Sequence, residues 1–347
     1  MCNRRAAARS LIGLAISPLI ALARFQLGMT VGTVRFDVLQ NDEPMKLLHL
    51  NVVLAAIDTD DGATGTLQGA RELHRAAGAA VHVVHVVPSR ADTDATVPSA
   101  DAAREKVQSV LEHVGIPVNE VTVHVLTGDP GHVIRSLADK VRADVVLLGR
   151  HRARDRAGEP LGSTALRVVT NSWAPCLILS RSMRLPLGRV LVPVDLSDTS
   201  RGALVIALSW ASALRGAEKG SGSARTEAVT LTALYVDHSS ADGSAHSKKN
   251  EALEEQLDSL RQDAGTWASV AIEGVVARGN DVPTVISDYA ATHDADLVVL
   301  GTRGLGSDPI GRLGSVSLGV GRKVGLPLLL VPPAVWRLLN ESRETTR

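Results

Sequence analysis

Residues 295–304 read Ala-Asp-Leu-Val-Val-Leu-Gly-Thr-Arg-Gly, an unbroken apolar run that ends in a glycine-rich turn. Apolar residues without alternation are typical of a strand that helices cover on both faces. Glycines directly after such a strand let backbone N–H groups approach an anion without interference from a Cβ atom. Gly314 and Ser315 then open a helical segment, with Ser as a preferred N-cap residue, and the free amides of a first turn attract anions. The stretch predicts a parallel α/β sheet with an anion site at the end of this strand.

The chain repeats this pattern. Residues 143–149, Ala-Asp-Val-Val-Leu-Leu-Gly, match residues 295–301, and two later segments match at the same offset. The matched pairs are 51–58 with 189–195, 143–149 with 295–301, 162–163 with 314–315, and 175–179 with 327–331. Several matches in one order and largely in one register indicate two copies of one domain.

Each copy reads as short apolar strands that alternate with helical segments. Helical spacing is seen in Val107, Leu111 and Val114 of the first copy, and in Leu253, Leu257 and Leu260 of the second. The strands expected in the second copy are Val190–Asp195, Val229–Val236, Val270–Val276, Asp296–Gly301 and Pro327–Val331. Polar loops are expected at 88–100 and 237–249. This alternation predicts two tandem doubly wound α/β domains, each with a parallel sheet and helices on both faces.

We divide the chain into four parts. They are an N-terminal extension (1–45), a first domain (46–182), a second domain (187–335) and a C-terminal tail (336–347). Within the extension, three arginines precede an apolar stretch that Pro18 interrupts, the outline of a signal peptide. Translation from Met29 or Met45 is a rival interpretation. We expect a disordered or non-native extension on a cytoplasmic protein, without stable membrane insertion.

Composition narrows the classes of function. The 37 basic and 37 acidic residues balance, so charge does not predict nucleic acid as a partner. Two cysteines cannot form a disulfide framework, and Cys176 lies in an apolar run, as a small buried residue would. The histidines, among them His82, His85 and His124, lack metal-ligand spacing, so we predict no metal site.

Asp195 follows the first strand of the second copy and has two interpretations. If that strand neighbours the fourth, the carboxylate lies across from the glycine loop, where it could accept hydrogen bonds from ribose hydroxyls. Alternatively, Asp195 only caps the helix that follows. Spacing alone leaves both interpretations open.

The pattern Gly301-x2-Gly304-x9-Gly314-Ser315, with Pro193-Val194-Asp195 and Tyr235-Val236, closely resembles that of the universal stress protein family. The resemblance covers both copies and implies a five-stranded parallel sheet in the order 3-2-1-4-5. It also implies dimerisation through the fifth strands. In a tandem chain the two halves can form that pair within one molecule, and a homodimer is a further option.

The resemblance also implies ATP as the ligand, with Mg²⁺ beside the triphosphate although its protein ligands are not identifiable. Asp195 would contact the ribose, and the backbone of Val236 would contact adenine. The glycines and Val316 would surround the phosphates. The predicted cofactor-binding residues are Pro193, Val194, Asp195, Val236, Gly301, Gly304, Gly314, Ser315, Val316 and Ser317. Weaker candidates in the first copy are Asp58, Val86, Gly149, Gly162 and Ser163.

The first copy departs from the pattern, because Arg152 stands where the second glycine is expected. A position that needs positive φ would disfavour this residue, and its side chain would block close approach of the backbone. The basic loop at 150–156 could hold a different anion or simply be solvated.

Three classes of function follow. The first is an ATP-binding stress-response or regulatory protein, in which nucleotide in the second domain modulates domain association or partner binding. The second is a slow ATP hydrolase or adenylating enzyme, for which Asp308 is the sole acidic residue inside the loop. The third is an interaction module without nucleotide. We predict no catalytic residues and favour the first class.

Overall fold

The computed structural model describes residues 50–59, 63–89, 99–150, 161–214, 228–238, 243–262, 270–304 and 313–336. The first domain comprises β1 (Val52–Ala56), α2 (Ala63–Ala77), β2 (Ala80–Val87), α3 (Ala100–Val114), the 3-10 turn η2 (Val118–Glu120), β3 (Val121–Thr127), α4 (Pro130–Val141), β4 (Val145–Gly149), α5 (Ser163–Asn171) and β5 (Cys176–Leu179). The second comprises β6 (Arg189–Val194), α6 (Asp198–Ala213), β7 (Val229–Asp237), α7 (Gly243–Gln262), β8 (Val270–Arg278), α8 (Val282–Thr292), β9 (Leu297–Gly301), α9 (Ser315–Lys323) and β10 (Leu328–Val331). The alternation of strands and helices is the predicted one in both domains.

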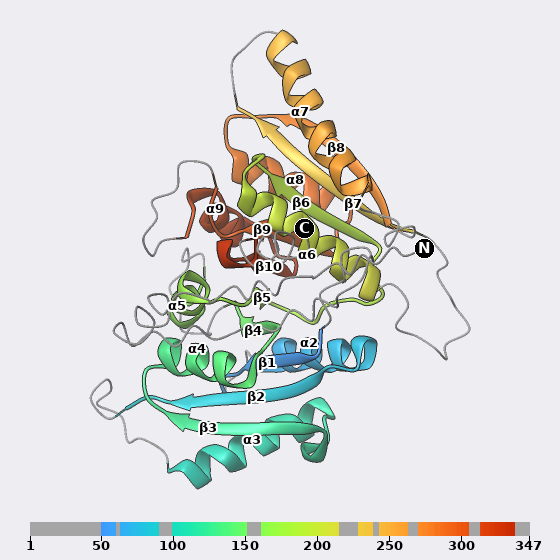
Figure 1. The fold of residues 1–347 in the computed structure, drawn as a ribbon. Coiled ribbons are helices and arrows are strands. Elements are labelled where there is room, and N and C mark those ends of the chain that lie inside the picture. Colours follow the sequence, from blue (N-terminus) through green and yellow to red (C-terminus); the bar gives the residue numbers. More distant parts are fainter. Residues whose placement is uncertain are drawn as a thin grey trace, which may run out of the picture. The chain divides into compact units, whose positions relative to one another are not determined.

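The strands form one ten-stranded sheet in the order β3-β2-β1-β4-β5-β10-β9-β6-β7-β8 (Figure 1). Within each domain the strands are parallel and follow the predicted order 3-2-1-4-5. The two domains join where β5 and β10 pair antiparallel, with Leu177 opposite Leu329. The expected pairing of the fifth strands within one chain is therefore confirmed.

The apolar core crosses this joint on both faces of the sheet. Leu177 and Leu329 belong to one core cluster, whereas Cys176 and Leu330 belong to the cluster on the other face. Adjacent residues of a strand point to opposite faces, so each face receives side chains from both domains. Burial raises the pKa of the Cys176 thiol to about 12, as expected for a protonated thiol that packs as a small apolar side chain.

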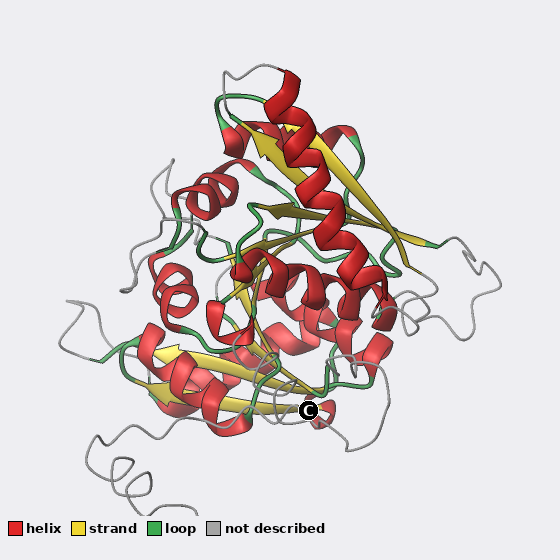
Figure 2. Ribbon diagram, turned by 45° about the horizontal axis from the view of Figure 1, so that its top comes forward, coloured by secondary structure: helices red, strands yellow, loops and turns green. Residues whose placement is uncertain are grey.

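Helices cover both faces of the sheet (Figure 2). Buried side chains of α2, α3, α6 and α7 share one core cluster, and those of α4, α5, α8 and α9 share the other. The predicted helical stripes are confirmed, because Val107 and Leu111 of α3 and Leu253 and Leu257 of α7 are fully buried.

Helix α6 is buried around most of its circumference, whereas α2 and α3, which share its core cluster, bury only one side. Trp336, in the segment predicted as a tail, is 9% exposed and lies against α6. A Cβ atom on Gly202 of α6 would lie 3.2 Å from the Trp336 Cβ. The Arg201 guanidinium lies 5.3 Å from the centre of the same indole ring. Trp336 therefore packs on the side of α6 that carries Gly202.

One expected loop is shorter than predicted. Residues 237–249 were expected to be irregular, but β7 includes Asp237 and α7 begins at Gly243. Ser247 and Lys248 are exposed, so this part of α7 has no apolar stripe in the sequence. The expectation was wrong because a solvated helical turn carries no hydrophobic periodicity.

Candidate functional site

The predicted site lies at one edge of the sheet, where β6 separates β7 from β9. Val190 and Leu191 of β6 pair in parallel with Leu297 and Val298 of β9. Strand order reverses between β6 and β9, and such reversal points are where open α/β sheets bind ligands. The segments that follow these strands therefore meet at one carboxyl edge.

Asp195 and Gly304 lie against each other at this edge. A Cβ atom on Gly304 would lie 2.3 Å from the Asp195 Oδ2. Any side chain at 304 would have to displace that carboxylate, because such a separation is far inside van der Waals contact. The φ angle of Gly304 is outside the left-handed region. Glycine is thus required here for close approach of the backbone, and the suggestion of positive φ at this position is not supported.

Hydrogen bonds of Asp195 bear on its two interpretations. Its Oδ1 accepts from the Ser197 amide at 3.1 Å and from the Ser197 hydroxyl at 2.5 Å. Ser197 is the N-cap of α6, where its own hydroxyl oxygen accepts from the Ser200 amide at 3.2 Å. Asp195 therefore orients the capping residue and does not cap α6 itself, while its Oδ2 faces Gly304.

Gly301 and Ser317 hold the surrounding elements together. A Cβ atom on Gly301 would lie 2.8 Å from the Thr199 Cγ2, so α6 packs directly on the end of β9. The Ser317 hydroxyl, 3% exposed, donates to the Gly301 carbonyl at 2.8 Å. These contacts fix the start of α9 relative to β9 and α6.

Helix α9 begins beside this turn. Gly314 is its N-cap, with no side-chain bond, and Ser315 is the first helical residue. Ser as the capping residue was therefore wrong, although the helix starts where predicted. The Gly314 amide donates to the Thr302 carbonyl at 2.9 Å, which returns the chain to the end of β9. The amides of the first turn have no acceptor within the helix, so they are suited to an anion.

The other predicted residues line the ends of β6 and β7. Pro193 pairs with Leu234 and Val194 with Tyr235 in the parallel register. Val236, near the end of β7, is 7% exposed and pairs with Ala277 of β8. Asp237, which ends β7 and is buried, was not among the predicted residues although it follows Val236 as Asp195 follows Val194.

The equivalent edge of the first domain shares several of these features where the structure describes it. Asp58 accepts from the Thr59 amide, and Gly162 is the N-cap of α5. The Gly162 amide donates to the Arg150 carbonyl at 2.9 Å, as Gly314 does to Thr302. Gly149 ends β4. Ser163, the first residue of α5, is exposed, and Val86 of β2 is buried. Residues 151–160, with Arg152, and Asp308 of the second domain lie outside the described residues.

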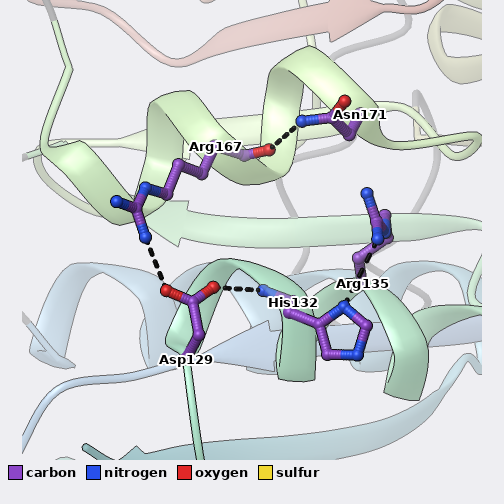
Figure 3. Close-up of polar contacts among 5 residues, drawn as sticks. All are labelled: Asp129, His132, Arg135, Arg167 and Asn171. Atoms are coloured by element: carbon purple, nitrogen blue, oxygen red, sulfur yellow. Dashed lines mark hydrogen bonds and ion pairs between the residues drawn. The ribbon is translucent and has the colours of Figure 1, made fainter. Parts of the chain in front are cut away.

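Arginine and aspartate also pair near α5 (Figure 3). Asp129 is the N-cap of α4 and accepts from the His132 amide at 2.9 Å. Arg167 of α5 lies 2.5 Å from the other Asp129 oxygen, and Asn171 donates to the Arg167 carbonyl. The Arg167 guanidinium is thus already paired with a carboxylate.

A separate cavity of about 590 Å³ lies at the opposite end of the second domain's strands. Its lining includes Arg181 and Arg184 of the linker, Gly188 before β6, and Asp296 before β9. The Asp296 carboxylate accepts from the amides of Gly188 and Arg189, so it fixes the start of β6. This cavity is not the predicted site.

Comparison with known proteins decides the family. The signature of the universal stress protein family matches residues 50–180 and again 186–332. The chain belongs to the universal stress protein family. It carries two such domains in tandem, each with the five-stranded arrangement described above.

Several known proteins are similar to this chain. Universal stress protein G from Shigella flexneri is 28% identical over 109 residues, which are 28% of this chain and 76% of that protein. The solved universal stress protein from Archaeoglobus fulgidus DSM 4304 shares the fold, with a TM-score of 0.56 at 18% identity, over 82% of this chain and 97% of that one. Another, from Archaeoglobus fulgidus in complex with dAMP, is 26% identical over 38% of this chain and 99% of that one, with a TM-score of 0.30.

Two further features of this universal stress protein concern metal ions and membranes. Among the described residues, no three His, Cys, Asp or Glu side chains gather as metal ligands would. Across the same residues, no helix has the length and apolar character needed to cross a membrane.

Proposed function

We propose that the second universal stress domain binds ATP, and that the bound nucleotide modulates domain association or the binding of a partner protein. One observation carries the proposal: the backbone at Gly304 lies directly against the Asp195 carboxylate. The contact occurs where strand order reverses, and α9 begins at the same edge. This arrangement suits a ligand that has both hydroxyl groups and an anionic end.

Each part of the edge has a role in this proposal. Asp195 accepts hydrogen bonds from the ribose hydroxyls, and its Oδ1 is kept in place by Ser197. The backbone of Val236 meets the adenine ring. The glycine turn and the first amides of α9 receive the phosphates, since oriented amides and the helix N-terminus favour negative charge. Mg²⁺ would neutralise phosphate charge when bound with the nucleotide.

Isothermal titration of the full chain with MgATP tests the proposal, using two matched variants. Asp195→Asn removes the carboxylate of the proposed site, and Asp58→Asn makes the same change at the first domain's equivalent position. A lost hydrogen bond to a charged group costs about 1.5–3 kcal/mol, so we expect affinity to fall roughly 10- to 100-fold in Asp195→Asn alone. Equal affinities in the two variants, or no heat from the wild type at millimolar ATP, would refute the site.

A further inference from the structure

Arg150 belongs to the first domain by sequence but contacts the second domain with its side chain. It directly follows β4, and its Nη1 donates to the Gly321 carbonyl of α9 at 2.9 Å. Its Nη2 donates to the Val324 carbonyl, just beyond the end of the helix. Ser180, also from the first domain, donates its hydroxyl to the next carbonyl, that of Gly325, at 3.0 Å. Three carbonyls at the end of α9 therefore accept hydrogen bonds from the first domain.

The Gly321 and Val324 carbonyls are groups that the end of α9 leaves without intrahelical partners, and the Gly325 carbonyl directly follows them. The last four carbonyls of an α-helix lack an amide donor, and they carry the negative end of the helix dipole. A guanidinium supplies several donors in a planar fork together with a positive charge. Arg150 is half-buried, and burial lowers its pKa, so the guanidinium is held at the joint at some cost in hydration. The contact is consequently a specific brace and not a solvated surface pair.

The second domain carries a different residue at the position of Arg150. The counterpart of Arg150 in the second domain is Thr302, by the match of residues 143–149 with 295–301. The Arg150 carbonyl accepts from the amide of Gly162, the N-cap of α5. In the same way, the Thr302 carbonyl accepts from the amide of Gly314, the N-cap of α9. The backbone of Arg150 therefore touches the start of α5 while its side chain holds the end of α9.

We infer that Arg150 is a positioning residue for the nucleotide site of the second domain. The inference rests on the proposed function, because α9 is the helix whose first turn would receive the phosphates. Arg150 holds the far end of this nine-residue helix and, with Ser317 at its near end, fixes where its first amides lie. In this view, displacement of Arg150 loosens α9 and weakens the binding of phosphate.

The affinities for ligands with different numbers of phosphates distinguish this positioning role from a general stabilisation of the fold. A residue that acts through α9 affects the phosphate end of a nucleotide and leaves the adenine and ribose contacts unchanged. Loss of Arg150 should therefore weaken ATP more than AMP, and should not weaken adenosine. A brace that only stabilises the protein would change the melting temperature and leave all three affinities in the same proportion.

The experiment uses titration of the full chain with ATP, AMP and adenosine, together with thermal unfolding. Arg150→Thr places the second domain's own residue at this position. Arg150→Lys keeps the positive charge but removes the planar guanidinium with its several donors. Arg167→Ala is the matched control, since Arg167 is an arginine of the same domain that pairs with Asp129. We expect ATP affinity to fall about 10-fold in Arg150→Thr and less in Arg150→Lys, with adenosine within about twofold and Arg167→Ala unchanged.

Contrary results are distinguishable. A folded Arg150→Thr variant that binds ATP as the wild type does would overturn the positioning role and leave the site intact. A parallel fall for ATP and adenosine would also overturn it. If Arg150→Thr does not fold, the same comparison is made with Arg150→Lys, for which equal loss of ATP and adenosine has the same meaning. A wild type that binds no ATP would instead remove the proposed function, and this inference with it.

Discussion

The two domains solve one packing problem in opposite ways. In the first domain, Gly131 of α4 lies under Arg167 of α5, with 2.8 Å between the Arg167 Cβ and a Cβ added at 131. In the second domain the residues at the equivalent positions are Pro283 of α8 and Gly319 of α9, and a Cβ on Gly319 would lie 2.4 Å from the proline ring. The helix pair needs one glycine, but either helix can supply it. A glycine lost from one copy is therefore not by itself a sign of lost function.

Gly304 is a glycine of a different kind. Its close neighbour is the end of the Asp195 carboxylate, not a helix, and its counterpart Arg152 has no glycine substitute beside it in the sequence. The helix pairs thus differ by a compensated exchange of one glycine, whereas in the sequence Arg152 replaces Gly304 without compensation. We attribute the second difference to the proposed function, in which the second domain binds the nucleotide and Arg150 of the first domain holds α9.

The largest expected effect comes from a side chain at 304. Gly304→Val must displace the Asp195 carboxylate, which is the mobile end of a side chain, so the fold should tolerate the change. We expect ATP affinity to fall about 100-fold or more, with an unfolding free energy within about 1 kcal/mol of the wild type. Titration and urea denaturation measure the two quantities. Gly325→Ala is the control, because a Cβ atom there meets nothing within 4 Å. Unchanged ATP affinity in Gly304→Val would break the distinction between the domains.

A smaller effect is expected at the helix pair of the second domain. Gly319→Arg introduces the first domain's residue against Pro283, and overpacking of this kind costs about 1–3 kcal/mol. Adding Pro283→Gly recreates the first domain's combination and should recover most of that loss. Urea denaturation of the single and double variants measures the coupling. If the double variant is no more stable than Gly319→Arg, the two pairs are not interchangeable.

The smallest effect concerns a histidine pair that the second domain lacks. His82 Nδ1 and His124 Nε2 are 2.9 Å apart, and Thr232 and Val275 are the register counterparts. Burial lowers the pKa of His82; burial, then His82 and Lys140, lower the pKa of His124. The folded domain thus binds these protons less readily than the unfolded chain.

Stability from this pair should be full above the ordinary histidine pKa of 6.5 and be lost as pH falls below it. Hydrogen exchange of β2 and β3 between pH 5 and pH 7.5, corrected for intrinsic rates, measures this change. His82→Thr with His124→Val should flatten the dependence. A pH profile identical in the wild type and the double variant would exclude the pair as its source.

The sequence predicted the architecture because continuous apolar runs and helical stripes persist in both copies. The expected strands of the second domain agree with the structure to within about two residues, and the register of the repeat located the strand ends that form the site. Start points of exposed helical turns were not predictable, since residues 243–249 of α7 carry no apolar stripe. The spacing of the glycines predicted Gly304 as a site residue. The close contact with Asp195, which explains why a glycine is needed there, became evident only from the structure.

The role of Arg150 could not be predicted, because it depends on how two domains pair. Its sequence signal was one arginine in a basic loop, which is as consistent with a solvated surface as with an anion site. Only the antiparallel pairing of β5 with β10 places it at the end of α9. Long-range contacts of this kind leave no local periodicity in the sequence.

The most direct test of the account is the number of nucleotides that one chain holds. Native mass spectrometry of the full protein with excess MgATP, across a range of concentrations that includes millimolar ATP, counts them. One ATP per chain is the predicted result, since the two domains share a fold but Arg152 stands in the first where the second has Gly304. Two ATP molecules bound with similar affinity, or none, would contradict it.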